Sequence, residues 1–355
     1  MKGVGDWSTP VGVALTAATV AALLAGWLRA RRQALAWDGW AALAALIAAE
    51  WLLFRGVEPV ATYFTPIAWT LYIVLADAMV RATGGWGQES GKGEEKTARG
   101  AQNAELGRGG EAREPGALLW TGRGAGEKAW ITLLSIPLWL IFEAYNLRLE
   151  NWTYVGLPEN LAGRYFGYAW SFATITPGIF VTADLIESFG WFAPRGRKKC
   201  SPVALRGWMA AGAVMLAVPL VLPRGVAAYL FAPVWLGFIF LLDPVNYRLG
   251  LASLAGDWAE GRRSRTCALL LSGWACGLLW EFWNYWAAAK WLYIFPMFQE
   301  WKIFEMPAPG FLGFPPFALE CFTMYVTARW MASGMTVAGQ EMQGARGPEG
   351  KGSSG

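Results

Sequence analysis

The sequence has no histidine, only four cysteines, and few charged residues. Of its 355 residues, 16% are charged, whereas an average soluble domain has about 25%. The absence of imidazole excludes a bis-histidine haem, a histidine-ligated zinc ion and a histidine proton relay. The cysteines show no CxxC pairing, so we expect no disulfide framework. Neither a metal ion nor a cofactor is expected.

Hydrophobic residues, by contrast, make up 55% of the chain, and 23 of them are tryptophans. Apolar runs long enough to cross a bilayer recur along the sequence. In hydrocarbon the backbone must satisfy its own hydrogen bonds, which favours helices. We therefore predict an all-α polytopic transmembrane helix bundle of about nine spans. The predicted spans are 11–29, 36–54, 61–80, 129–146, 167–189, 207–222, 225–242, 267–286 and 311–333.

Every odd-numbered connection between these spans contains more lysine and arginine than the even-numbered connections. The positive-inside rule assigns such connections to the cytoplasm. We therefore expect an N-terminus outside and a C-terminus inside. The first span has its positive charges after its apolar core, which is typical of an anchor and not of a cleaved signal peptide. The net charge of +4 indicates basic inner loops and no nucleic-acid partner.

Composition divides the chain into four regions. We expect a three-span region over 1–82 and a six-span core over 129–335. Between them, residues 83–128 are rich in Gly, Glu, Lys and Arg, which predicts a disordered cytoplasmic insertion because too little apolar surface is available to order it. Residues 336–355 are predicted to form a disordered tail.

Two segments of the core resemble each other and predict a parallel internal repeat over 129–189 and 267–333. In both, Glu-x-x-Asn is followed by Trp-x-Tyr, and a proline lies 23 residues after the tyrosine. Each copy would be a helix ending outside, an aromatic outer loop and a returning helix. The matching positions are Glu143, Asn146, Trp152, Tyr154 and Pro177 in the first copy, and Glu281, Asn284, Trp291, Tyr293 and Pro316 in the second.

Three carboxyl groups are expected inside the membrane, where ionisable residues are costly and usually functional. Glu143 and Glu281 each have an asparagine three residues later, Asn146 and Asn284, on the same helix face. Glu320 lies nearer the midplane. No Lys or Arg is deep enough to neutralise these groups, so we expect them to be protonated, bonded to one another or bound to a cation. The alternative is a structural role, with Glu–Asn pairs joining helices by hydrogen bonds.

Aromatic residues crowd the end of the eighth span and the loop after it, among them Trp280, Trp283, Trp291 and Tyr293. They could form an interfacial belt or line a pocket. Aromatic faces stabilise cations, and a buried carboxylic acid can donate a proton. Together these groups would suit acid-initiated carbocation chemistry on an isoprenoid. Prolines and glycines over 304–317 predict a partly unwound entrance to such a pocket.

Four stretches carry a resemblance to known proteins: Trp280-Glu-Phe-Trp-Asn284, Lys290-Trp-Leu-Tyr293, Phe304-Glu-Met-Pro307 and Gly310-Phe-Leu-Gly-Phe-Pro-Pro-Phe-Ala-Leu-Glu320. They are similar to a family of uncharacterised bacterial multispan membrane proteins. That resemblance implies a multi-pass protein of the bacterial inner membrane. The chain also resembles, more weakly, the membrane-embedded lycopene cyclases, which repeat helix pairs and place carboxylates beside prolines. They carry Pro-x-Glu-Glu, whereas here Pro316 is followed by Phe-Ala-Leu-Glu.

These observations favour a membrane enzyme or binding protein that acts on an isoprenoid or another lipid. Glu143, Glu281 and Glu320 would be acid/base groups, oriented by Asn146 and Asn284. The substrate would be a hydrophobic small molecule held by Trp280, Trp283, Trp291 and Tyr293. A neutral lipid is favoured because no Asp-rich diphosphate motif is apparent. The alternatives are a proton- or cation-coupled transporter that uses the same carboxyls, and a scaffold without a substrate.

Overall fold

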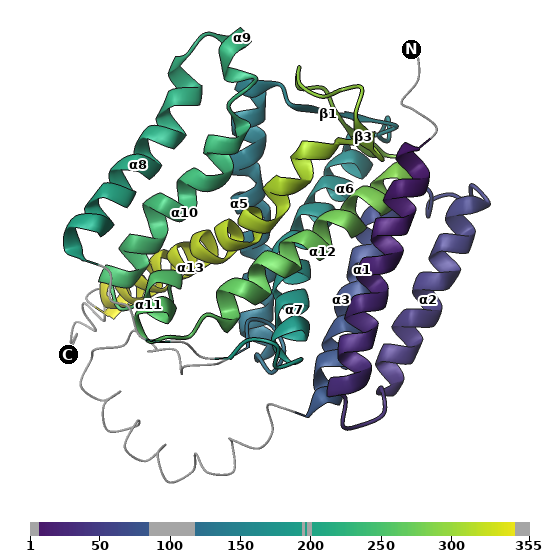
Figure 1. The fold of residues 1–355 in the computed structure, drawn as a ribbon, viewed down its shortest axis with the longest axis horizontal. Coiled ribbons are helices and arrows are strands. Elements are labelled where there is room, and N and C mark those ends of the chain that lie inside the picture. Colours follow the sequence, from purple (N-terminus) through teal and green to yellow (C-terminus); the bar gives the residue numbers. More distant parts are fainter. Residues whose placement is uncertain (1–6, 85–117, 194–195, 197–200, 345–355) are drawn as a thin grey trace, which may run out of the picture.

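The computed structural model describes residues 7–84, 118–193, 196 and 201–344, without the side chains of 335–344. It is mostly helical (Figure 1). Seven described segments are long and apolar enough to cross a membrane, as an integral membrane protein requires. They are α1 (Ser8–Ala30), α2 (Trp37–Phe54), α3 (Phe64–Thr83), α5 (Ala125–Leu149), α6 with α7 (Leu161–Glu187), α8 (Pro202–Val221) and α12 (Ser264–Trp286).

The two other predicted spans coincide with α10 (Phe231–Arg248) and α13 (Phe314–Gly344), which are less apolar. Polar residues lower their hydropathy, namely Asp243 and Arg248 in α10 and Glu320 and Arg329 in α13. The count of nine spans thus stays a prediction. Two short helices, α9 (Arg224–Ala227) and α11 (Leu254–Ala259), lie in connections. The fifth predicted span is divided at Thr174 into α6 (Leu161–Ala173) and α7 (Ile175–Glu187).

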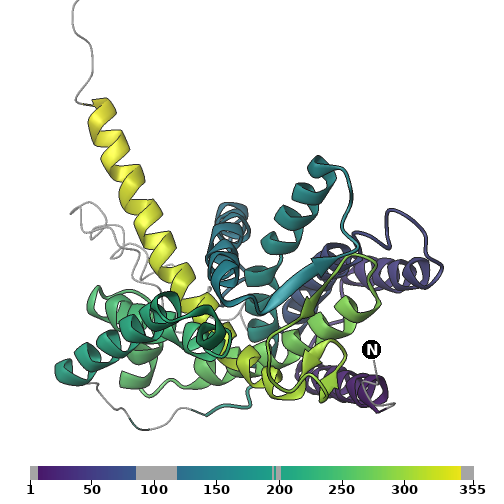
Figure 2. The same ribbon diagram turned by 90° about the horizontal axis from the view of Figure 1, so that it is seen from above.

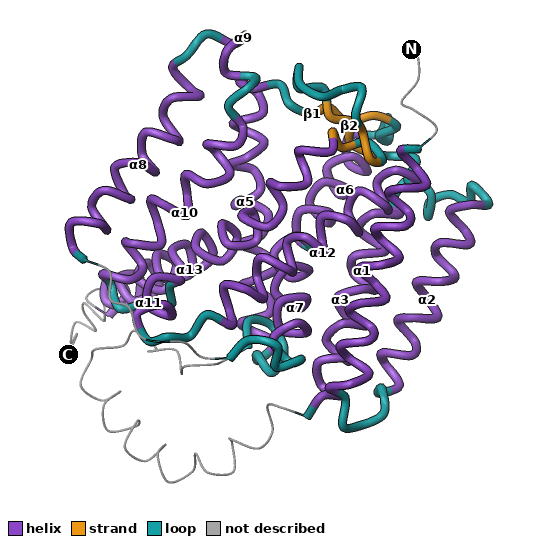
Figure 3. The backbone as a smooth tube through the Cα atoms, viewed as in Figure 1, coloured by secondary structure: helices purple, strands orange, loops and turns teal. Residues whose placement is uncertain are grey.

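Two small antiparallel sheets, which were not predicted, lie in the connections between the helices (Figure 3). One pairs β1 (Trp152–Val155) with β2 (Lys290–Tyr293), and the other pairs β3 (Lys302–Ile303) with β4 (Met306–Pro307). A 3₁₀ helix, η2 (Ala308–Gly313), leads from β4 into α13. Non-α-helical backbone was expected here from the prolines and glycines of 304–317. Both sheets lie at the same end of the bundle, called here the strand end.

The opposite end, called here the insertion end, is where the described chain stops at Gly84 and resumes at Leu118 (Figure 1). Most of the predicted insertion, 83–128, therefore lies outside the described residues, although α5 already begins at Ala125. The predicted tail overlaps α13, whose helix continues to Gly344. The far part of α13 projects beyond its neighbours (Figure 2).

The core is built around α7 and α12, which are the most enclosed of the apolar helices. α12 packs against α7 and α13, while α3 packs on α7 and α10 packs on α13. Close approach of α12 to the start of α13 depends on Gly273, where a Cβ atom would collide with the backbone of Phe314. Small residues serve this purpose at helix contacts in membranes, because apolar burial adds little driving force there.

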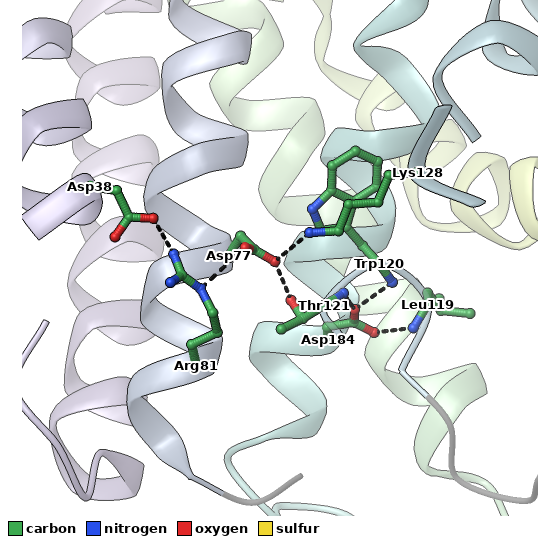
Figure 4. Close-up of polar contacts among 8 residues, drawn as sticks. All are labelled: Asp38, Asp77, Arg81, Leu119, Trp120, Thr121, Lys128 and Asp184. Atoms are coloured by element: carbon green, nitrogen blue, oxygen red, sulfur yellow. Dashed lines mark hydrogen bonds and ion pairs between the residues drawn. The ribbon is translucent and has the colours of Figure 1, made fainter. Parts of the chain in front are cut away.

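Buried aspartates organise the insertion end (Figure 4). Asp184, which is fully buried, accepts hydrogen bonds from the backbone amides of Leu119, Trp120 and Thr121 at 2.6, 2.7 and 2.9 Å. The neighbouring Asp77 accepts a bond of 2.9 Å from the Thr121 hydroxyl. It also forms ion pairs with Arg81 and Lys128 at 3.3 and 3.4 Å.

Asp243 plays a comparable part on α10, where it accepts bonds from the amides of Leu254 and Ala255 at 2.7 and 2.9 Å. From the sequence alone, aspartates at these positions could face lipid headgroups and water. In the structure, Asp184 and Asp243 instead accept hydrogen bonds from buried backbone N–H groups, each of which needs a partner.

Candidate functional site

Glu143 on α5 is held through a single oxygen at the strand end. Its Oε1 accepts hydrogen bonds from the Tyr154 hydroxyl at 2.5 Å, the Trp139 indole N–H at 2.8 Å and the Trp152 indole N–H at 3.3 Å. Trp139 lies one turn earlier on the same helix, while Tyr154 and Trp152 belong to β1. The strand thus reaches back over the helix end to hold the carboxyl.

Asn146, one turn after Glu143, fixes the start of that strand. Its amide nitrogen donates to the Trp152 carbonyl at 2.9 Å. Its amide oxygen accepts from the backbone N–H groups of Asn151 and Trp152 at 2.8 and 3.2 Å. An amide side chain can donate through its nitrogen and accept through its oxygen at the same time. The asparagine therefore determines where the Trp-x-Tyr segment lies relative to the carboxyl.

Glu281 on α12 has the same surroundings. Its Oε1 accepts from the Tyr293 hydroxyl at 2.9 Å and from the Trp291 indole N–H at 3.4 Å. Asn284 donates to the Trp291 carbonyl and accepts from the Trp291 N–H, both at 2.9 Å. Unlike Glu143, Glu281 is fully buried, and its Oε2 has no partner among the described groups.

The two strands that carry these aromatics pair with each other. In the antiparallel β1–β2 ladder, Trp152 is opposite Tyr293 and Tyr154 is opposite Trp291, on either side of the Thr153–Leu292 pair. Exchanging the strands leaves this register unchanged, because tryptophan faces tyrosine at both positions. The two Glu–Tyr pairs are therefore arranged about one local centre, at the strand end.

A cavity that is partly open at the surface lies beneath the β1–β2 ladder between α3, α5, α6, α12 and α13. Its walls are mainly aromatic. They include no Asp or Glu, and they include two basic residues, Arg164 and Lys290. The aromatic residues of the lining are Tyr63, Trp69, Trp139, Trp152, Tyr154, Tyr168, Phe172, Trp235, Trp280, Trp291, Tyr293, Phe314 and Phe317.

No family model, curated protein or solved structure matches this chain. The resemblance to uncharacterised membrane proteins and to lycopene cyclases therefore stays an expectation. The chemistry of the site has to be derived from its own residues.

Three of the six residues predicted to bind substrate line the cavity. Trp280, Trp291 and Tyr293 are in its wall. Trp283 is not: it packs against Trp69 and donates its indole N–H to Glu50 at 3.2 Å. Asn146 and Asn284 are also outside the lining, because they are used to hold the strands.

The predicted acid/base residues are not exposed to the cavity. Glu143 and Glu281 stand behind the wall, and Tyr154 and Tyr293 separate them from the interior. Glu320 is elsewhere, one turn beyond Phe317 on α13 and close to the Phe238 backbone of α10. It is fully buried, and neither of its oxygens meets hydrogen-bond geometry with a described group. The structure thus joins the first two carboxyls to one cavity and leaves the third apart.

The hydroxyls that face the cavity remain protonated at neutral pH. Burial raises the pKa of Tyr154 and Tyr293 well above their usual range, and the adjacent carboxyls add to this effect. Lys302, whose ammonium group donates to the Tyr293 carbonyl at 3.3 Å, has a lowered pKa because of its burial. The tyrosines therefore act as hydrogen-bond donors in the resting site.

Two further polar groups of the wall have no protein partner. The Thr65 hydroxyl and the Trp69 indole N–H, one turn apart on α3, are buried and make no hydrogen bond within the described chain. A buried donor without a partner costs about 1–3 kcal/mol. The sequence analysis did not single out these residues, since their role appears only when α3 is seen to face α6 across the cavity.

Proposed function

We propose that this protein binds an isoprenoid or another lipid in the aromatic cavity and acts on it by acid/base chemistry. One observation carries the proposal: Tyr154 and Tyr293 line the same cavity, and the hydroxyl of each donates a hydrogen bond to a glutamate behind the wall. The lining between them is suited to an apolar molecule, because pockets for such ligands are mostly apolar with a few placed polar groups.

Each Tyr–Glu pair supports a short proton relay. In the acid direction, the tyrosine hydroxyl gives its proton to the ligand and takes one from the protonated glutamate, which becomes a carboxylate. In the base direction the same two transfers run in reverse. A positive charge developed on the ligand would face the rings of Trp139 and Trp280, and aromatic faces stabilise cations. This is the acid-initiated chemistry expected from the sequence, with tyrosine as the group that touches the ligand.

The same proposal includes the finer topology. α10 and α13 would complete nine spans, with the strand end outside and the insertion end in the cytoplasm. The two copies, 129–189 and 267–333, would be products of a duplication. Support comes from the matching hydrogen bonds around Glu143 and Glu281 and from the exchange-symmetric β1–β2 register.

Native mass spectrometry of the detergent-purified protein, with extraction of the bound lipid, tests the proposal. Ser171 lies in the cavity wall, so Ser171→Trp should fill the cavity and abolish lipid retention. Ala210→Trp is the matched control, because Ala210 is exposed on α8. Retention of the same lipid by both variants would show that the cavity is not the site.

Glu281→Gln and Glu143→Gln test the acid/base role separately. Both residues are outside the lining, so we expect lipid still to be retained. If the relay acts on it, the retained lipid should differ in mass from the wild-type one, because substrate accumulates. Identical lipids in all three proteins would contradict the acid/base role and leave a binding function.

Glu320 supports a second candidate, a proton-coupled carrier. An enclosed carboxyl without a partner, deep in a membrane bundle, is typical of proton pathways. Reconstituted liposomes would then show a proton flux that Glu320→Gln abolishes and that Glu305→Gln leaves intact, since Glu305 is at the strand end with Lys290. The absence of a proton flux from liposomes with the wild type and with both variants would contradict the carrier function.

A further inference from the structure

The two basic residues of the cavity differ in how their charge is balanced. Lys290 forms an ion pair with Glu305 at 2.8 Å and lies over the Tyr285 ring. Arg164 donates its Nε–H to the Pro158 carbonyl at 3.1 Å and has no ion pair with any Asp or Glu of the described chain. The described cavity wall contains no acidic residue, so no carboxylate of that wall offsets the Arg164 charge.

The position of Arg164 on α6 increases the local positive potential. It lies in the first turn of this 13-residue helix, whose N-terminus is capped by the Asn160 side chain accepting from the Ala162 amide at 2.9 Å. The N-terminus of a helix carries a partial positive charge, so a cation is disfavoured there and an anion is favoured. Helix end and guanidinium together make this edge of the cavity attractive to an anion.

The remainder of the wall is apolar, and Arg164 lies in the same wall as Trp69, Trp139 and Trp280. A small inorganic anion would leave this aromatic surface uncovered, whereas a neutral lipid would leave the guanidinium without a counterion. An amphiphile with an anionic head satisfies both. The planar guanidinium fork matches phosphate oxygens in a bidentate manner.

We infer that the ligand of the cavity is a lipid with a phosphate head, bound at Arg164, whose apolar body lies against the tryptophans. This deepens the proposed lipid function and rests on it. It differs from the neutral lipid expected from the sequence. That expectation relied on the absence of Asp-rich motifs, and a phosphate bound directly by arginine requires none.

Two matched pairs of probes test the inference on delipidated protein by native mass spectrometry. One pair is dioleoyl phosphatidic acid and dioleoylglycerol, and the other is a polyprenyl phosphate and its polyprenol. Within each pair only the phosphate differs. We expect the wild type to bind the phosphate of at least one pair about ten-fold more tightly than its alcohol, a difference typical of one charged contact.

Three variants assign that preference to one side chain. Arg164→Gln should remove it while the alcohol is still bound, which also shows that the variant is folded. Arg164→Lys should keep part of it. Arg224→Gln is the matched control, because Arg224 is exposed and pairs with Glu150 away from the cavity. It should behave as the wild type.

The outcomes separate this inference from the function on which it rests. Equal binding of phosphate and alcohol, or a preference that survives Arg164→Gln, would overturn the phosphate head and leave a lipid cavity. Displacement of phosphatidic acid by an equal concentration of inorganic phosphate would indicate a free-anion site and also overturn it. If the wild type bound neither member of either pair, and Ser171→Trp changed nothing, the lipid function itself would fail.

Discussion

Tyr154 lies directly opposite Trp291 in the β1–β2 ladder, so an aromatic that holds Glu143 is paired with one that holds Glu281. Directly opposed residues of an antiparallel pair are close enough for their side chains to interact. The two carboxyl sites are therefore mechanically connected through the sheet, although they belong to different helices. A change at one should be felt at the other.

The first prediction measures that connection. Tyr154→Phe and Tyr293→Phe each remove one hydrogen bond to a carboxyl, which should lower stability by about 1–3 kcal/mol. Because the strands are in contact, we expect the double variant to lose less than the sum of the single losses. Thermal unfolding in detergent measures all three, with Tyr165→Phe as an exposed control. Strict additivity would contradict the connection.

A second prediction concerns alkaline pH. The pKa of both tyrosines is raised in the folded protein by burial, whereas an unfolded tyrosine ionises near pH 10. The unfolded chain thus loses these protons first, so their contribution to stability is complete below about pH 10 and is lost as pH rises towards the folded values. The Tyr154→Phe/Tyr293→Phe protein should show a shallower fall in melting temperature above pH 10. A fall as steep as that of the wild type would be evidence against raised values.

The asparagines give a third prediction. Asn146→Ala and Asn284→Ala should each destabilise the protein by roughly 2 kcal/mol, because at least two strand hydrogen bonds lose their partner. Asn→Asp at either position keeps the acceptor but removes the donor, and should cost less than alanine. Asn160→Ala, which removes only a helix cap, is the control. Equal losses of stability for the alanine and aspartate variants would contradict the conclusion that each asparagine both donates and accepts hydrogen bonds.

The insertion end provides a fourth prediction. Asp184→Asn replaces an acceptor of three backbone bonds with a group that can accept through one atom only. Amide exchange over residues 119–121 should therefore become faster by at least about ten-fold, with α12 unchanged. Hydrogen-exchange mass spectrometry measures both regions. Asp243→Asn should leave 119–121 protected and affect 254–255, and any other distribution would refute the assignment.

Hydropathy located the helices because spans are long and their composition is averaged over many residues. Every predicted span overlaps a described helix, and the fifth overlaps two helices that meet at Thr174. The strands could not be predicted from local sequence, since β1 is only four residues long and pairs with β2, which is distant in the chain. Short strands depend on a partner strand for their stability, and here that partner is distant in the chain.

The candidate site was predictable where it depends on local spacing. Glu143 with Asn146, and Trp152 with Tyr154, meet because a helix end and the following strand are adjacent in sequence. The separate location of Glu320 was not predictable, because depth along a helix does not say which neighbour a side chain faces. Nor was the role proposed for Arg164, which depends on the absence of an acidic residue from the described cavity lining.

Because the two strands come from distant parts of the chain, the parts of the site form at different times during synthesis. The bonds from Tyr154 and Trp152 to Glu143 join near neighbours and can form as soon as β1 follows α5 out of the ribosome. The cavity, however, needs β2 and the start of α13, which emerge much later. A nascent chain that ends after α10 therefore carries one complete carboxyl site and an aromatic wall without its opposite side. The walls of the cavity are thus complete only after α12, β2 and the start of α13 have been synthesised.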